Sequence, residues 1–319
     1  MTQQSDVIAG TSAAVETVGG ATTAGALERA KLRSTPGFYT RAWHRFRRNK
    51  VAIVALILSF AIVLFALTAG LLSEYVTGYT YSENHLRTKL SNPGEHGYIL
   101  GSDGNGRDIL TRLAYGGRVS LLVAFLATLS TLLIGGSVGS VAGYFGGFID
   151  TVLMRLVDVL LCIPTLSLLI LISALYHPGY VSLAFFIATV SWAGVARLIR
   201  GEVLSLRGRD YVDAARVIGA SNRRIIWRHI IPNIIPTIVV WTSLVIPAFI
   251  LTEAALSFLG LGVRIPTPSW GNMLQEAQPF YQNNWMNVFF PGFLIYITVL
   301  CINLVGNGLR DALDPRLSD

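Results

Sequence analysis

Residues 51–72 form an uninterrupted apolar run, VAIVALILSFAIVLFALTAGLL, that contains no charged side chain. A helix needs about 20 residues to cross the roughly 30 Å of hydrocarbon in a bilayer. Inside that hydrocarbon every backbone polar group must be bonded within the chain, which excludes an open strand or an irregular loop. The run therefore predicts a membrane-spanning helix.

Five further segments are long and apolar enough for the same interpretation: 119–143, 152–175, 181–199, 234–259 and 289–307. The segment 152–175 is the weakest, because Arg155 and Asp158 fall in its first two turns and Pro164 interrupts it. Arg155 and Asp158 are spaced i, i+3, and we expect them to pair with each other. The chain is predicted to be an all-α membrane protein with six transmembrane helices.

The composition supports this class. Of the 319 residues 13% are charged, whereas about a quarter are charged in an average soluble domain. The net charge of +7 comes from arginines in short segments between the apolar runs, a distribution that fits membrane topology better than nucleic-acid binding. Cys162 and Cys301 lie inside apolar runs, and the five histidines have no ligand spacing, so neither a disulfide framework nor a metal site is expected.

The distribution of Lys and Arg predicts the orientation, because positive side chains resist translocation. With the N-terminus inside, the cytoplasmic segments hold eight (1–50), eight (197–233) and two (308–319), and the long external segments hold five (73–118) and one (260–288). Both termini are therefore predicted to be cytoplasmic. The first apolar run begins too deep in the chain for a cleavable signal peptide, and we interpret it as a retained signal anchor.

The predicted organisation has five parts. Residues 1–40 are rich in Thr, Ala, Gly and Ser and are predicted to be a disordered cytoplasmic tail. The parts that follow are an interfacial segment with the first transmembrane helix (41–72), an extracytoplasmic loop (73–118), a transmembrane core with a cytoplasmic loop at 200–233 (119–307), and a cytoplasmic C-terminal tail (308–319). The basic and aromatic stretch AWHRFRRNK at 42–50 suits contact with anionic membrane lipid, although a simple positive flank accounts for it equally well.

Small residues at Gly135, Gly139 and Gly143 recur every four positions in the second predicted span. This spacing places them on one helix face and lets another helix approach closely. The pattern predicts tight packing and leaves the partner helix open.

The cytoplasmic loop RGRDYVDAARVIGASNRRIIWRHIIPN at 207–233 carries more order than a connection needs. Residues at i, i+3, i+4 and i+7 form one small apolar face of a short helix: Tyr211, Ala214, Ala215 and Ile218. Gly219 is predicted to end this helix, Ser221 to cap a second one, and Pro232 to end the loop beside the next span. The segment predicts a helix, turn, helix unit whose alanine-lined face is available to another protein.

The stretch DAARVIGASNRRIIWRHIIPN resembles the EAA loop of bacterial ABC importer permeases, the coupling element that docks on a separate ATPase. Asp213, Ala214 and Ala215 stand at the family's Glu-Ala-Ala, Gly219 at its glycine, and Pro232 at its terminal proline. Asp213 in place of glutamate and His229 in place of isoleucine are the two departures. The resemblance implies that the ATPase-coupling residues are Tyr211, Asp213, Ala214, Ala215, Gly219, Ala220, Ser221 and Pro232.

The branch is indicated by RFRRNKVAIVAL, LGSDGNGRDILTRLAYGGRVSL, TEAALSFLGLGVRIPTPSWGNML and GNGLRDALDPR, which are similar to the C-type permease of dipeptide, oligopeptide and nickel importers. The resemblance runs from Arg45 to Arg316 and implies the type I ABC importer permease fold. It implies a non-catalytic subunit with no cofactor of its own, in a bacterial or archaeal inner membrane. The implied partners are a homologous B-type permease, two ATPase subunits that bind ATP and Mg, and an extracytoplasmic substrate-binding protein. Peptide is the expected substrate class, with nickel as the alternative.

Three other features of the sequence bear on function. The stretch GSDGNGRD cannot be a phosphate-binding Walker A loop, because that loop needs a lysine directly after a glycine and none of the three lysines of the chain follows one. Asp103, Arg107 and Asp108 in this stretch are expected to be turn and ion-pair residues, with docking of a binding protein as the alternative. Glu253 is expected either to line the pathway or to be solvated. An ion-coupled secondary transporter would show two repeated halves and charged residues near the middle of the membrane. An intramembrane hydrolase would show catalytic residues at the same depth in the membrane. The sequence shows neither pattern.

Overall fold

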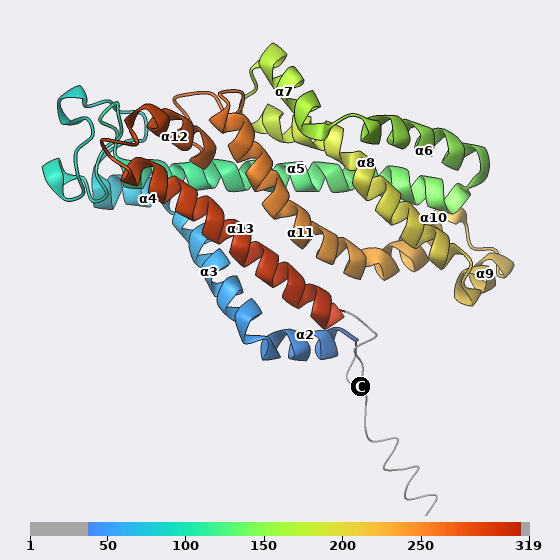
Figure 1. Cartoon of the computed structure of the whole chain (residues 1–319). Coiled ribbons are helices and arrows are strands. Elements are labelled where there is room, and N and C mark those ends of the chain that lie inside the picture. Colours follow the sequence, from blue (N-terminus) through green and yellow to red (C-terminus); the bar gives the residue numbers. More distant parts are fainter. Residues whose placement is uncertain (1–37, 314–319) are drawn as a thin grey trace, which may run out of the picture. The chain divides into compact units, whose positions relative to one another are not determined.

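A computed structural model describes residues 38–313. The predicted tail at 1–40, apart from its last three residues, and the final residues of the predicted C-terminal tail lie outside this range. The described residues fold as helices joined by loops, with no strand among them (Figure 1). The chain divides into two units, residues 1–45 and 46–319, and the description below concerns the second. Helix α2 (Phe38–Arg48) crosses this boundary.

After α2, Asn49 caps the helix α3 (Lys50–Leu67), which is followed by the short α4 (Ala69–Leu72) and the π-turn η1 (Ser73–Thr77). A polar loop with two short 3-10 turns, η2 (Leu86–Thr88) and η3 (Glu95–Gly97), leads to the long helix α5 (Ile109–Phe145). The chain continues through α6 (Gly147–Cys162), α7 (Thr165–Tyr176), α8 (Tyr180–Arg207) and α9 (Asp210–Val217). The last elements are α10 (Asn222–Ile225), the π-turn η4 (Ile226–Ile230), α11 (Ile231–Phe258), α12 (Trp270–Ala277), η5 (Gln278–Phe280) and α13 (Met286–Leu313).

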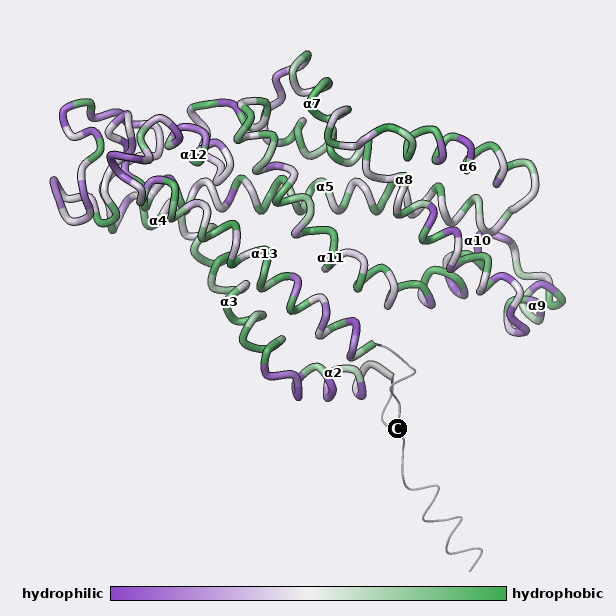
Figure 2. The backbone as a smooth tube through the Cα atoms, viewed as in Figure 1, coloured by the Kyte–Doolittle hydropathy of each residue, from purple (hydrophilic) through white to green (hydrophobic). Residues whose placement is uncertain are grey.

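Five of the described helices are long and apolar enough to cross a membrane, and a sixth crossing is counted if the bent pair α6 and α7 is one span. Apolar residues cover the long helices, whereas polar residues gather in the loop before α5 and around α9, at opposite ends of α5 (Figure 2). The prediction of an all-α protein with apolar spans is confirmed.

Two predicted spans differ from the structure. Helix α5 begins at Ile109, inside the predicted external loop 73–118, because the Asp108 carboxylate accepts a hydrogen bond of 2.7 Å from the Thr111 amide and caps the helix there. The predicted third span 152–175 is not one straight helix, since α6 and α7 meet at an angle of 81°. Ile163 is extended at this break, as the residue before a proline tends to be, and Pro164 supplies no amide proton to continue α6.

Helices α5 and α8 share the most extensive contact of any helix pair in the second unit. A Cβ atom added at Gly139 would lie 2.4 Å from the Ala196 carbonyl oxygen, and one added at Gly135 would lie 2.5 Å from the Trp192 carbonyl oxygen. In a bilayer lipid is as apolar as the helix faces, so association depends on such close packing and on polar contacts. The glycine face predicted from the sequence therefore meets α8 of the same chain.

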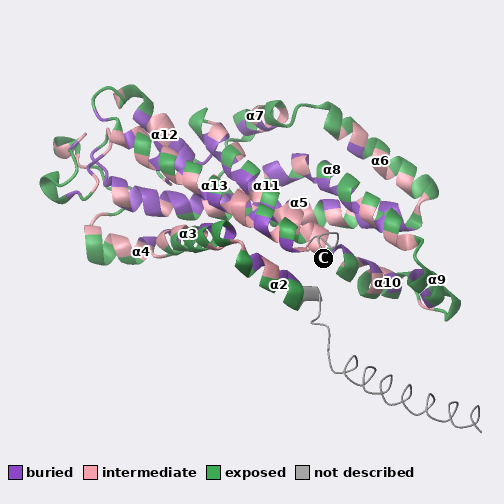
Figure 3. Ribbon diagram, turned by 60° about the horizontal axis from the view of Figure 1, so that its bottom comes forward, coloured by how far each residue is buried: buried purple, intermediate pink, exposed green. Residues whose placement is uncertain are grey.

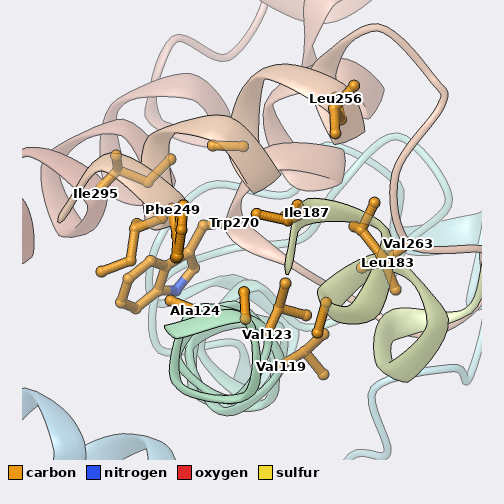
Figure 4. Close-up of a cluster of buried hydrophobic side chains, with 14 of the residues drawn as sticks. Val119, Val123, Ala124, Leu183, Ile187, Phe249, Leu256, Val263, Trp270 and Ile295 are labelled. Atoms are coloured by element: carbon orange, nitrogen blue, oxygen red, sulfur yellow. The ribbon is translucent and has the colours of Figure 1, made fainter. Parts of the chain in front are cut away.

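The largest core cluster lies around Trp270, which begins α12. Figure 4 shows side chains from α5, α8, α11 and α13 around it. The Trp270 indole is fully buried and donates a hydrogen bond of 3.0 Å to the Leu113 carbonyl oxygen. Its ring occupies space that a larger residue at Gly117 would block, because a Cβ atom there would lie 2.7 Å from the ring.

Candidate functional site

Helix α9 is anchored on one side and open on the other. Val212 and Ala215 are buried in a cluster that includes Val203 of α8 and Ile234 of α11. The opposite side is exposed along most of its length (Figure 3), and Ile218 just after it is 84% exposed. A short helix that keeps a large apolar residue exposed beside a packed anchor is suited to contact another protein.

A groove of about 600 Å³ lies beside the buried anchor of α9. It is lined by Tyr211, Ala214, Ala215, Ile218, Ala220, Arg224, Arg228 and His229. The four residues that the sequence placed on one helix face all line it, although Ala215 is buried at its floor and is not part of an exposed face. The groove combines small apolar walls with two guanidinium groups.

The turn after α9 has the geometry that the sequence predicted. Gly219 has a φ of +80°, a conformation that L side chains rarely adopt, and its amide donates to the Arg216 carbonyl oxygen at 2.9 Å. The Ser221 hydroxyl accepts a hydrogen bond of 3.4 Å from the Arg224 amide and caps the next helix. The Tyr144 hydroxyl donates to the Asn222 side chain at 2.8 Å, which ties the turn to the end of α5.

Pro232 lies in the first turn of α11, where the sequence predicts that the loop meets the next span. The sequence did not indicate that α10, η4 and α11 follow one another without a break from Asn222 to Phe258. The wide turn η4 precedes the proline, and there the Ile231 amide bonds to the Ile226 carbonyl oxygen. A widened turn accommodates a proline ring that would clash in a regular helix. A displacement at Ser221 would therefore reach the membrane span along a continuous helix.

The Asp213 carboxylate is paired within α9. It accepts a hydrogen bond of 2.8 Å from the Arg216 guanidinium, and its side chain is 60% exposed. Arg216 also lies over the Tyr144 ring, 5.8 Å from its centroid. Asp213 therefore holds Arg216 in place and remains accessible to a partner.

At the other end of α5, Asp103 and Arg107 form the local ion pair predicted from the sequence. The Arg107 Nε atom donates to the Asp103 carboxylate at 2.7 Å. The sequence did not indicate that Glu276 of α12 joins them, accepting from Arg107 at 2.8 Å and from Arg112 at 2.5 Å. Both guanidinium groups are almost fully buried, so the cluster fastens the loop before α5 to α12.

Asp108 is also buried, at 1% exposure, and serves as the N-cap of α5. Burial raises the pKa of its carboxyl group above the usual value, and hydrogen bonds from Thr111 oppose that shift. With Arg107 at 3% exposure, these two side chains do not form an outer surface for a docked protein. The structure gives them the turn and pairing roles expected from the sequence.

The predicted pair of Arg155 with Asp158 is wrong. Asp158 instead accepts a hydrogen bond from Arg197 of α8, and Asp150 pairs with Arg200 one turn further along α8, with an Nη2 to Oδ2 distance of 2.6 Å. Both acidic residues on α6 therefore hold that helix against α8. Spacing along one helix could not reveal a cationic partner about 40 residues away.

Both expectations for Glu253 are wrong, because it is fully buried inside the chain. Its two carboxyl oxygens accept hydrogen bonds from Ser120 and Ser257, each at 2.7 Å. Three hydrogen-bonding groups meeting inside the bundle offset the cost of burying a carboxyl group. The role visible in the structure is to join α5 to α11.

The described residues hold no group of three or more His, Cys, Asp or Glu side chains that could bind a metal ion. His85 stacks edge-on against Tyr79, and its imidazole lies 3.2 Å from Glu83. His96 lies near the Ser91 hydroxyl at 3.3 Å. The two histidines of the loop before α5 therefore contact different side chains.

Comparisons with known proteins place the chain in a family. The model of the binding-protein-dependent transport system inner membrane component matches residues 135–319, and that of the N-terminal TM domain of oligopeptide transport permease C matches residues 37–93. The dipeptide transport system permease protein DppC of Alkalihalophilus pseudofirmus is 41% identical over 280 residues, which cover 88% of this chain and 90% of that one. The oligopeptide transport system permease protein OppC of Escherichia coli is 40% identical over 277 residues, 86% of this chain and 90% of its own.

A solved structure of the MetNI methionine ABC transporter in an inward-facing conformation is also similar, with a TM-score of 0.49 and 17% identity over 64% of this chain and 96% of that one. The matches to the two family models and to the curated relatives span most of the sequence, including the 207–233 loop, the α5 helix and α13. The chain belongs to the family of binding-protein-dependent transport system inner membrane components, as a C-type, multi-pass permease of the ABC importers.

Proposed function

We propose that this permease imports di- or oligopeptides by forming half of a transmembrane pathway with a homologous B-type permease. It takes substrate from an extracytoplasmic binding protein and is driven by two ATPase subunits that bind ATP and Mg. The names of the relatives, dipeptide and oligopeptide permeases, support the peptide class. The chain itself carries out no covalent step, and both of its termini lie in the cytoplasm of a bacterium or archaeon.

The observation that carries this proposal is the two-sided character of α9. Val212 and Ala215 pack into the cluster shared with α8 and α11, and exposed residues of the same helix line an open groove next to them. A partner seated in the groove could move α9 only together with the helices that anchor it. Such a rigid unit can transmit a displacement, which a flexible loop would absorb.

The proposed mechanism is a two-state rearrangement. ATP binding draws the ATPase subunits together and pulls on the segment Asp213–Gly219. The pull passes to α8 through Val212 and to α11 through the continuous helix from Asn222. ATP favours the outward-open arrangement because the partner binds α9 best in that state.

The test uses the complete importer in proteoliposomes, with Ile218→Lys as the altered permease. Ile218 lines the groove together with Arg224 and Arg228, and no acidic residue of the described chain lines it. A lysine at this position would be buried when the ATPase occupies the groove, and it would have no anionic partner on the permease side. We expect peptide uptake and stimulation of ATP hydrolysis by the binding protein to fall by about tenfold or more. Val217→Lys is the matched control, because Val217, the neighbour of Ile218 at the end of α9, is 87% exposed and does not line the groove.

Unchanged uptake and ATPase stimulation in Ile218→Lys, with normal insertion, would show that α9 is not the coupling element. The substrate is tested separately on the unaltered importer by uptake of labelled dipeptides, labelled oligopeptides and nickel. Uptake of nickel without peptide would overturn the peptide assignment and leave the coupling assignment standing.

A further inference from the structure

Three arginines and one tryptophan gather in the first two turns of the helix that starts at Asn222. Arg223 and Trp227 are spaced i, i+4, as are Arg224 and Arg228, so the four lie on neighbouring faces of the helix. With Ser221 they line an open pocket of about 560 Å³. All four side chains are exposed, and Trp227 is 65% exposed.

This pocket concentrates positive charge that the rest of the described chain does not neutralise. Within residues 38–313, the ion pairs of this end of the bundle are made by Arg197, Arg200 and Arg216, and none of the three pocket arginines takes part in one. The first turn of the helix contains no acidic residue. Three guanidinium groups held together repel one another, and a bound anion would lower that repulsion.

A second, apolar groove of about 300 Å³ adjoins the pocket. It is lined by Leu132, Leu133, Gly136, Ser137, Ser140, Val141, Ile199, Ile226, Trp227, Ile231, Ile234 and Ile238. The Ser137 hydroxyl donates to the Leu133 carbonyl oxygen of its own helix, so it offers this groove no free proton. Trp227 lines both the charged pocket and the apolar groove and marks the boundary between them.

We propose that the pocket and the groove together bind one anionic phospholipid. The phosphate group contacts Arg223, Arg224 and Arg228, and an acyl chain lies in the groove between α5 and α11. Trp227 sits at the level where polar headgroup and hydrocarbon meet, a position that suits an aromatic ring with one polar edge. This assignment depends on the chain spanning a membrane and does not depend on the coupling role of α9.

An acidic surface of a soluble partner is the competing occupant, and the groove argues against it. Its walls come from α5, α8 and α11, three candidate membrane spans, so the occupant has to enter hydrocarbon. A lipid satisfies both halves of the site at once, whereas a soluble protein could reach only the arginines. Because Arg224 and Arg228 also line the groove beside α9, the lipid would reduce the positive charge that an ATPase meets there.

The experiment measures quenching of tryptophan fluorescence by brominated lipids in the assembled importer, reconstituted in phosphatidylcholine vesicles. Equal mole fractions of brominated phosphatidylglycerol or brominated phosphatidylcholine are added. The contribution of Trp227 is the difference between the unaltered importer and the Trp227→Phe variant. We expect phosphatidylglycerol to be bound near Trp227 in preference to phosphatidylcholine by about tenfold, since each basic residue near an anionic surface contributes favourably.

The double variant Arg223→Gln/Arg228→Gln should lose most of this preference. Arg310→Gln, at an exposed arginine in the last turn of α13, should retain it. A thermal unfolding profile confirms that each variant is folded before the comparison is made. Equal quenching by the two lipids, or a preference that survives in the double variant, overturns the proposal. A preference that appears only after the ATPases are removed also overturns it, because the arginines would then belong to the ATPase interface.

Discussion

The Ser120 hydroxyl on α5 donates a hydrogen bond of 2.7 Å to the Glu253 carboxyl group on α11. The same hydroxyl oxygen lies 3.3 Å from the Trp270 amide, and the Ser257 hydroxyl, which also donates to Glu253, lies 3.2 Å from the Val263 amide. One buried carboxyl group thus orders two hydroxyl groups, and these in turn hold the start of α12 and the loop before it. The cluster is a structural joint between helices.

Replacement of Ser120 by alanine should destabilise the protein. The change removes one donor to a fully buried carboxyl group and one acceptor for the Trp270 amide, a loss of about 1–3 kcal/mol for groups left without partners. The measurement is thermal unfolding in detergent. Ser137→Ala is the control, because the Ser137 hydroxyl is exposed and bonds only within its own helix. Equal unfolding temperatures for the two variants would contradict a structural role of this joint.

Alanine substitutions at two glycines of α5 one turn apart should have different effects on stability, because only one of them faces the backbone of α8. Gly139→Ala should lower the unfolding temperature, because its Cβ atom would lie 2.4 Å from a backbone oxygen of α8. Gly136→Ala meets nothing closer than 3.5 Å, and we expect it to be neutral or to gain up to about 1 kcal/mol from helix propensity. Thermal unfolding of both variants in the same detergent tests the ordering. The reverse ordering would mean that the two helices do not approach as described.

Glu276 should be the most sensitive member of the cluster before α5. Glu276→Gln removes the negative charge that Arg107 and Arg112 share and leaves Asp103 as their remaining anionic partner. Breaking a buried pair of this kind costs about 3–5 kcal/mol. Limited proteolysis should then cut the 73–108 segment faster, whereas Glu83→Gln, at a more exposed carboxylate near His85, should leave the cleavage rate unchanged. A resistant Glu276→Gln protein would show that the loop is held by other contacts.

The sequence predicted the helices far better than the polar clusters, and the reason is physical. The hydrocarbon core leaves the backbone only the helix, so an apolar run such as 51–72 is sufficient to place α3. Ion pairs depend on which helices meet, and this information is absent from local spacing. Arg107 finds Glu276, 169 positions away, and Asp158 finds Arg197 in place of the neighbour Arg155.

In the loop 207–233, too, the sequence predicts the features that depend on neighbouring residues and misses those that depend on distant helices. The end of α9 at Gly219 and the cap at Ser221 follow from local backbone chemistry, and the sequence predicted both. The burial of Ala215 depends on α8 and α11, which lie outside the loop. The sequence predicts that the loop ends at Pro232, but the helix already runs through the wide turn before this proline. Pro236 and Pro247 also lie inside α11, so a proline in this sequence does not by itself mark the end of a helix.

Substitutions at Gly219 test the effect of backbone conformation alone, because a side chain at this position would meet no steric obstacle within the described chain. No atom lies within 4 Å of a Cβ atom built at Gly219, so a side chain would fit, but its φ of +80° disfavours any residue other than glycine. Gly219→Val should cost about 1–3 kcal/mol at the turn and reorient α9 relative to Ser221, because a β-branched residue tolerates this conformation least. Gly219→Asn should be much milder, since asparagine adopts positive φ more readily.

The readout for these two variants is peptide uptake and ATP hydrolysis by the complete importer, normalised to the amount of inserted permease. If α9 couples the ATPase to the pathway, Gly219→Val should lower uptake while the permease still inserts, and Gly219→Asn should keep most of it. Similar losses in both variants would point to contact of a partner with the glycine surface, because conformation alone predicts that they differ. Full activity in both would mean that the direction of α9 after the turn does not control transport.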